Sequence, residues 1–298
     1  MKQRTKIRHK GSQLTAVLVL GIASVLTIFP FLLLVLSSFT DEQVLMVNGY
    51  SIFPEKWSLD AYLYIFQSAN SILKSYGLSI VVTVIGTIVS MVITSLMAYP
   101  LSRKDLKGRT FFTFFVFFTM LFNGGLVSQY MLWSTILQIK NTIFAYLVPN
   151  LMMSAFNVMI MKNFFANNVP FEIIESAKID GSGEWNTFFK IVLPMSTPIL
   201  AAVGLLVSLA YWNDWMNGLY YINNPKMYTF QNLLNRMIQQ VDFLSSSDAN
   251  YLGGRIIKLP SVSVRMAIAS LGVLPVMMIY PFFQKYFAKG LTIGAVKG

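Results

Sequence analysis

Charged and apolar residues are segregated into long blocks along this chain. Six stretches contain no charged residue, namely residues 14–40, 75–102, 110–139, 141–161, 191–213 and 266–284. A helix needs about 20 residues to cross the roughly 30 Å hydrocarbon core of a bilayer, and a charge at its centre costs about 2.5–3.5 kcal/mol. We therefore expect an all-α membrane protein with about six transmembrane helices, over residues 14–36, 77–100, 111–137, 142–161, 193–215 and 266–283.

Proline and glycine are expected to interrupt some of these spans. Pro30 lies inside the first span and should kink it, because proline lacks a backbone N–H and clashes with the preceding turn. The third span contains Asn123, Gly124 and Gly125 in succession, which should break it into two helical pieces. In the polar segments, we expect short helices over residues 60–66 and 230–241.

Composition and charge placement support a membrane protein and fix its orientation. Only 12% of residues are charged, about half the usual share in soluble domains. With the N-terminus in the cytoplasm, 15 of the 23 basic residues fall in inner segments, as the positive-inside rule requires. The net charge of +11 is then explained without nucleic acid. Both termini and residues 163–190 are expected in the cytoplasm.

The expected domain organisation follows from these spans. Residues 1–12 form a basic cytoplasmic tail, and residues 13–74 hold an uncleaved first helix and an external loop. Residues 75–288 form a core of five helices with a cytoplasmic loop at 163–190 and an external loop at 217–264. Residues 289–298 form a cytoplasmic tail.

The residue types that enzymes and metal sites use are scarce. The chain has no cysteine and one histidine, His9, in the basic N-terminal segment. It also lacks a glycine-rich loop ending in Lys-Ser or Lys-Thr, which would hold nucleotide phosphates. We expect no catalytic residue, no metal site and no cofactor bound by this chain.

The polar segment of residues 169–194 predicts a helix, a turn and a second helix. Pro170 suits a first helical turn, and acids at Glu172 and Glu175 are favoured there by the helix dipole. Gly181 can end the first helix in a left-handed conformation, and Ser182 can cap the next one. From spacing alone, this unit is either a helix lying on the bilayer surface or a docking element for a cytosolic partner.

The same segment resembles the EAA loop of bacterial ABC importer permeases. That pattern reads Glu-Ala-Ala, three residues, Gly, nine residues, then Ile-x-Leu-Pro. Here every spacing matches, with one small-for-small departure at Ser176; the matching residues are Glu175, Ser176, Ala177, Gly181, Ile191, Leu193 and Pro194.

The resemblance implies the fold, the partners and the role of this loop. It implies a type I ABC importer permease fold in the bacterial cytoplasmic membrane. The implied partners are a second permease subunit, most simply in a heterodimer, a cytosolic ABC ATPase dimer that carries ATP and Mg, and an extracytoplasmic solute-binding protein. The loop would be the coupling helix that contacts the ATPase, chiefly through Glu172, Glu175, Asp180 and Gly181.

Two further segments resemble sugar-importer permeases of the maltose-transporter type. The first lies where the fifth span ends, and aromatic rings with amides and a carboxylate suit sugar hydroxyls there; its residues are Trp212, Asn213, Asp214, Trp215 and Asn217. The alternative for these residues is an interfacial aromatic belt. The second is the C-terminal segment, where Gly290, Gly294 and Lys297 are expected at the ATPase interface.

Other functions fit the sequence less well. An ion-driven secondary transporter would need a central acidic group or a pair of glycine-broken repeats, and a membrane enzyme would need paired carboxylates, His or Cys. The intramembrane polar residues Asn123, Gln129 and Asn157 fit contacts between helices better than a transport pathway. The sequence thus predicts an ABC permease, with a sugar as its solute and a non-sugar solute as the alternative.

Overall fold

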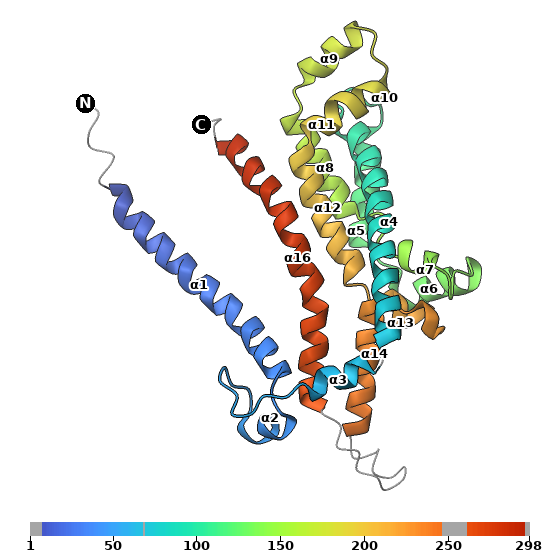
Figure 1. Cartoon of the computed structure of the whole chain (residues 1–298). Coiled ribbons are helices and arrows are strands. Elements are labelled where there is room, and N and C mark those ends of the chain that lie inside the picture. Colours follow the sequence, from blue (N-terminus) through green and yellow to red (C-terminus); the bar gives the residue numbers. More distant parts are fainter. Residues whose placement is uncertain (1–7, 68, 246–260, 296–298) are drawn as a thin grey trace. The chain divides into compact units, whose positions relative to one another are not determined.

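The computed structural model describes residues 8–67, 69–245 and 261–295, and it is almost entirely helical (Figure 1). No strand occurs within these ranges; one isolated antiparallel bridge joins Thr40 and Trp57. The chain divides into two compact units, residues 1–69 with 236–274 and residues 70–235 with 275–298. The fold class predicted from hydrophobic blocks, a helical membrane protein, is confirmed.

The first unit contains the first predicted span and the external segment that follows it. Its helices are α1 (Arg8–Ser38), α2 (Glu42–Asn48), α3 (Asp60–Phe66) and the first part of α16 (Ser261–Ala295). The window of α1 with the highest hydropathy has none of its residues buried within the chain, as suits a helix facing lipid or another subunit. Pro30 lies within α1, which is assigned as one helix throughout.

The second unit is a helical core around α4 (Ala69–Ser102) and α12 (Thr197–Trp212). Buried side chains such as Val82, Val158 and Val207 form one hydrophobic cluster. The remaining helices, several of them short, are α5 (Arg109–Leu121), α6 (Gly125–Met131), the π-helix η1 (Leu132–Ile136), α7 (Phe144–Leu147), α8 (Ala155–Asn168), α9 (Phe171–Ile179), α10 (Glu184–Thr187), the π-helix η2 (Phe188–Val192), α11 (Leu193–Met195), α13 (Met216–Tyr221), the 3₁₀-helix η3 (Pro225–Met227) and α14 (Phe230–Ser245), which continues into the first unit.

The sequence of α4 explains why it packs as it does. Its buried face consists mainly of small or hydroxylated residues at helical spacing, such as Ser79, Gly86 and Ser90, whereas large residues such as Ile80 and Ile88 are exposed. Small side chains let neighbouring helices approach closely in a membrane, where lipid already satisfies large apolar ones. The hydrophobic pattern of α4 is therefore inverted relative to a soluble helix.

Four helices in the described ranges are long and apolar enough to cross a membrane: Gln13–Ser38, Ala69–Ser102, Thr197–Tyr221 and Val262–Ile279. The third predicted span is broken at Asn123–Gly124, as its sequence indicated. The helix axis bends by 109° between its two pieces. It counts as a fifth span if that bent pair is one crossing.

The prediction of one helix over residues 142–161 is wrong. The structure has α7 and α8 on either side of an irregular segment that contains Pro149 and Asn150. Proline removes a helical hydrogen bond, and Asn150 adopts a left-handed φ of 62°, so a continuous helix cannot pass through this point. α8 then continues to Asn168, beyond the expected end at Met161.

Several expected loops are shorter than predicted because helices extend into them. α4 starts at Ala69 rather than near Gly77, and α16 starts at Ser261. The expected tail from residue 289 is helical as far as Ala295. The helices predicted over 60–66 and 230–241 are confirmed as α3 and the main part of α14.

Candidate functional site

Residues 170–190, here called the elbow, project beyond one end of the helical core (Figure 1). α9 begins after Pro170, which has an extended backbone as its N-cap, rather than with proline inside the first turn. α10 begins after Gly183, so Ser182 does not cap it as predicted. Instead, the Ser182 hydroxyl accepts a hydrogen bond from the Asn186 amide at 2.9 Å.

The turn of the elbow is a glycine-dependent helix stop. Gly181 has a φ of 78°, in the left-handed region. The Ser182 N–H donates to the Ala177 carbonyl at 2.8 Å, and the Gly181 N–H donates to the Lys178 carbonyl at 3.0 Å. These two bonds form a Schellman motif, which satisfies the last carbonyls of α9. The predicted helical stop at Gly181 is confirmed, together with its geometric cause.

The predicted contact residues of the elbow lie on an open surface. Glu172, Glu175 and Asp180 are exposed, whereas Ala177 is buried beneath them. Ile179, at the tip, is 86% exposed. An isoleucine that protrudes next to acidic side chains is typical of a surface that a protein partner covers.

The last motif residues lie where the elbow returns to the core. Ile191 and Leu193 are half-buried and Pro194 is exposed, across the junction of η2 and α11. Ser196 then starts α12 after a further break. The Ile-x-Leu-Pro segment thus lies in a helical stretch that is irregular at η2 and ends at the Ser196 turn before α12.

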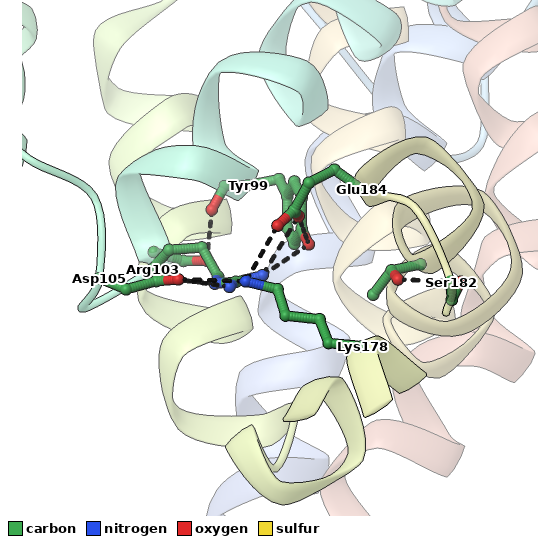
Figure 2. Close-up of polar contacts among 8 residues, drawn as sticks. Tyr99, Arg103, Asp105, Lys178, Ser182 and Glu184 are labelled. Atoms are coloured by element: carbon green, nitrogen blue, oxygen red, sulfur yellow. Dashed lines mark hydrogen bonds and ion pairs between the residues drawn. The ribbon is translucent and has the colours of Figure 1, made fainter. Parts of the chain in front are cut away.

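Four charged side chains form a closed ring between the elbow and the end of α4 (Figure 2). We call this the ion ring: Arg103, Asp105, Lys178 and Glu184. Arg103 Nη2 lies 2.7 Å from Asp105 Oδ2, and Arg103 Nη1 lies 3.3 Å from Glu184 Oε2. Lys178 Nζ closes the ring, 3.2 Å from Glu184 Oε1 and 3.4 Å from Asp105 Oδ2.

Arg103 is the centre of this ring. Its side chain is only 7% exposed, and both its Nε and Nη2 donate to Asp105, which is the strong bidentate arrangement. Its Nη1 donates to the Tyr99 hydroxyl at 2.9 Å, and that hydroxyl in turn donates to Glu184 at 2.9 Å. The buried guanidinium therefore has hydrogen-bond acceptors for Nε, Nη1 and Nη2, and two carboxylates balance its charge.

The ring lowers the pKa of both carboxyl groups. Hydrogen bonds from Arg103 hold the pKa of Asp105 at about 2. Burial by itself would raise the pKa of Glu184, but hydrogen bonds from Tyr99 and Lys178 and the nearby cations bring it below the ordinary value. Both carboxyl groups are therefore charged at neutral pH.

A cavity of about 440 Å³ lies against the ring. Its apolar wall comes from both sides of the junction, with Leu96 and Leu106 from the α4 side and Trp185 and Phe188 from the elbow. Arg103 and Glu184 contribute its polar wall. The contact between elbow and α4 is thus an interface with a hollow beside it.

The residues of the ion ring had no functional role in the prediction from sequence. None of the four was among the residues expected to contact a partner or the solute. The one available signal was an Arg-x-Asp pair at the end of a span, which is too short to be distinctive. Their meeting depends on how the elbow folds back, which local spacing does not predict.

The residues expected along a substrate path differ in their exposure. Trp212 and Asn217 are buried, whereas Asn213 and Trp215 are exposed. Asp214 Oδ1 accepts from the Asn217 N–H at 3.1 Å, so this carboxylate is bonded to the first turn of α13. A direct contact with solute is thus open to Asn213 and Trp215, and it stays a prediction.

Breaks in three helical segments meet near this point. The Asn217 side chain donates to the Pro149 carbonyl at 3.1 Å, which joins the α12–α13 break to the α7–α8 break. Asn150 Nδ2 donates to Gln129 Oε1 at 3.2 Å, and Gln129 Nε2 donates to Asn123 Oδ1 at 3.2 Å. This chain of amides joins both breaks to the bend between α5 and α6. Gln129 thus contacts a separate segment of the chain at Asn150, whereas the contacts between helices predicted for Asn123 and Asn157 stay predictions.

Of the expected C-terminal contact residues, Gly290 and Gly294 fall within α16, and Lys297 lies outside the described residues. Within the described ranges, no group of three or more His, Cys, Asp or Glu side chains could hold a metal ion.

Comparison with known proteins identifies the family. Residues 11–293 match the family described as "Binding-protein-dependent transport system inner membrane component". The chain is 38% identical to the Protein LplC of Bacillus subtilis (strain 168), over 95% of this chain and 93% of that one. It is 40% identical to the polygalacturonan/rhamnogalacturonan transport system permease protein YtcP of the same organism, over 92% and 94%.

A more distant relative is similar in sequence, and a solved structure is similar in fold. The chain is 30% identical to the arabinooligosaccharides transport system permease protein AraQ of Halalkalibacterium halodurans, over 98% of this chain and 99% of that one. A crystal structure of a bacterial ABC transporter involved in the import of the acidic polysaccharide alginate contains a chain with a TM-score of 0.76 at 24% identity, covering 95% and 99%. The chain therefore belongs to the family of binding-protein-dependent transport system inner membrane components, as a membrane-spanning permease subunit of such a transporter.

Proposed function

We propose that this permease imports a sugar or oligosaccharide and that the elbow couples it to a separate ABC ATPase. The relatives named for polygalacturonan, rhamnogalacturonan and arabinooligosaccharide transport support the choice of solute. The proposed partners are a second permease subunit, an ATPase dimer that binds ATP and Mg, and an extracytoplasmic solute-binding protein. This chain supplies no catalytic group to ATP hydrolysis.

The coupling role rests above all on the glycine-stopped elbow. A Schellman motif gives the turn one defined geometry, so a force applied at the tip is passed on instead of being absorbed by a flexible loop. Ile179 offers the tip an apolar contact, and Glu172, Glu175 and Asp180 surround it with negative charge. Rigid elements that rotate about packed interfaces are the usual means of switching between conformations.

The chain of amides between the helix breaks supports a polar path for the solute. Non-helical backbone at membrane depth is tolerated only where protein buries it or where it lines an aqueous cavity. Asn123 and Asn150 are exposed within the described part of the chain, among large apolar residues such as Leu126 and Val127. We place these amides, together with Asn213, along the route of the sugar, since amides both donate to and accept from hydroxyl groups.

The test is reconstitution of the full transporter in proteoliposomes with the ATPase inside and the binding protein outside. Uptake of labelled pectin-derived and arabinan-derived oligosaccharides is measured with and without ATP. We expect at least one of these sugars to be taken up, and we expect this uptake to require the ATPase. Uptake without the ATPase would contradict the coupling role. If none of the sugars were taken up and another class of solute were transported, the assignment of a sugar as the solute would be contradicted.

Gly181 provides a matched test of the elbow itself. A side chain in a left-handed conformation costs about 1–2 kcal/mol, so Gly181→Val should distort the turn and reduce ATP-driven uptake strongly. Gly183→Val is the control, because Gly183 has an ordinary φ of −71° and nothing within 4 Å of an added Cβ. Equal coupling in the two variants would argue against the elbow as the force-bearing element.

A further inference from the structure

The ion ring joins both arms of the elbow to one point on α4. Lys178 lies near the end of α9, before the Gly181 turn, and Glu184 opens α10, after it. Arg103 and Asp105 directly follow the last residue of α4. The ring therefore spans the turn and attaches its two sides to the same helix end.

Aromatic packing around Arg103 extends this attachment along the elbow. The guanidinium carbon lies 6.0 Å from the ring centre of Phe171, at the start of α9, and 5.8 Å from that of Tyr99. The Tyr99 ring also packs on Phe188, with centroids 5.1 Å apart. Arg103 thus touches the beginning of the elbow and is linked to its turn and its return arm.

The covalent route from the elbow to the core is helical but irregular at two places, the π-helix η2 and the turn at Ser196. It runs through the π-helix η2, the three-residue helix α11 and the break at Ser196 before α12 begins. A π-helix is rare and irregular in its hydrogen bonding, and the Ser196 turn is a second place where the chain can bend. A push on the elbow would be partly absorbed along this route.

α4, by contrast, is a single helix of 34 residues, about 50 Å long at 1.5 Å per residue. Near its other end, the Ser79 hydroxyl accepts from the Phe230 N–H at 2.7 Å, and the Tyr76 ring lies 3.8 Å from that of Phe230. Tyr76 also contacts Trp212, with ring centroids 5.9 Å apart. One uninterrupted helix therefore connects the ion ring to the end of α12, where the predicted sugar path lies.

We infer that Arg103 is a positioning residue that fixes the elbow to α4, so that the two move as one rigid body and α4 carries the movement of the elbow across the membrane. This inference rests on the proposed coupling role of the elbow. It assigns the transmission of movement to the non-covalent contact between the elbow and α4, in preference to the route along the chain through η2 and α11.

The first test compares Arg103→Gln with Lys104→Gln in the reconstituted transporter. Lys104 is exposed, adjacent and takes no part in the ion ring, so both variants lose one positive charge from the same turn. We expect Arg103→Gln to lower the number of sugars imported per ATP hydrolysed by about tenfold, with ATP hydrolysis continuing. Lys104→Gln should keep the ratio of the unmodified protein, and an unchanged ratio in Arg103→Gln would overturn the inference.

Arg103→Lys separates positioning from charge. Lysine keeps the positive charge but cannot make the bidentate contact with Asp105, so we expect a ratio between those of Arg103→Gln and the unmodified protein. A full return to the unmodified ratio would show that charge alone suffices and would contradict the positioning role.

A cross-link tests the rigid body directly and does not depend on an altered ion ring. Leu106 and Trp185 line the same cavity from opposite sides of the junction, and the chain has no cysteine of its own. The double variant Leu106→Cys/Trp185→Cys, with cysteine-free partner subunits, is treated with a reducible thiol cross-linker after assembly. We expect uptake to persist when the two sites are joined.

Loss of uptake on cross-linking, restored by a reducing agent, would mean that the elbow and α4 separate during transport. That result would overturn the inference while leaving the proposed function intact, because the uncross-linked transporter would still import sugar with ATP. Failure of the proposed function would appear earlier, as a lack of ATP-dependent uptake in the unmodified protein.

Discussion

The ring of Tyr211 lies where a side chain at position 86 would have to be. A Cβ built on Gly86 would lie 2.5 Å from Cε1 of Tyr211, closer than real Cβ atoms approach. The Tyr211 hydroxyl continues past this contact and donates to the Leu147 carbonyl at 2.8 Å. Gly86 thus permits α4 and α12 to pack together, and it leaves Tyr211 free to bind the end of α7.

Gly86→Ala should therefore destabilise the protein by about 1–3 kcal/mol, the usual range for overpacking. The neighbouring Gly77→Ala is the control, because it lies in the same helix with nothing within 4 Å of an added Cβ. This control should be neutral or stabilising by about 0.5–1 kcal/mol, since alanine favours helix. Thermal unfolding of both variants in detergent is the measurement, and equal Tm values would contradict the close contact.

Glu42 holds the start of α16 in the first unit. Its carboxylate accepts from the backbone N–H groups of Val262 and Ser263 at 2.9 and 2.8 Å, and from the Ser263 hydroxyl at 2.7 Å. Hydrogen bonds to a charged group are worth about 1.5–3 kcal/mol each, so Glu42→Ala should free these amides.

Hydrogen exchange at Val262 and Ser263 measures that effect. We expect both amides to exchange faster in Glu42→Ala and to keep their protection in Glu55→Ala, an exposed acid that accepts a hydrogen bond from Asn48. Unchanged protection in Glu42→Ala would mean that this carboxylate does not cap α16.

The ion ring should contribute stability that depends on pH. The pKa of Asp105 is lowered from 3.8 to about 2, so its contribution is complete above pH 3.8 and is lost as the pH falls toward 2. Because the side chain is 47% exposed, the contribution should not exceed about 1 kcal/mol. The stability difference between the unmodified protein and Asp105→Asn is measured against pH; a difference that persists undiminished at pH 2 would contradict the shift.

Asn217 and Asn213 should respond differently to removal of their amides. Asn217→Ala leaves the buried contact with the Pro149 carbonyl unmade and should cost about 1–3 kcal/mol of stability. Asn213 is exposed and its side chain accepts one long hydrogen bond, from Gln231 at 3.4 Å, so Asn213→Ala should leave Tm unchanged and raise the KM for sugar uptake. A fall in Tm for Asn213→Ala with unchanged KM would remove Asn213 from the proposed path.

The amino-acid sequence was sufficient for the membrane-spanning character, the helical stop at Gly181 and the short helices at 60–66 and 230–241. These features depend on local physics: the cost of charge in hydrocarbon, the left-handed backbone that glycine tolerates, and the periodicity of apolar residues over one or two turns. The EAA-like spacing likewise needed only the order of residues, and the family match agrees with it.

Which of these elements are in contact depends on how the whole chain packs. The sequence around Pro149 read as one span because its residues are apolar, although proline and the left-handed Asn150 divide it. Arg103 and Glu184 are 81 positions apart, and their charges carry no mark of pairing until the elbow folds back onto α4. Attraction between charges acts over a few ångströms in space, and that distance is set by packing of the whole unit rather than by neighbours along the chain.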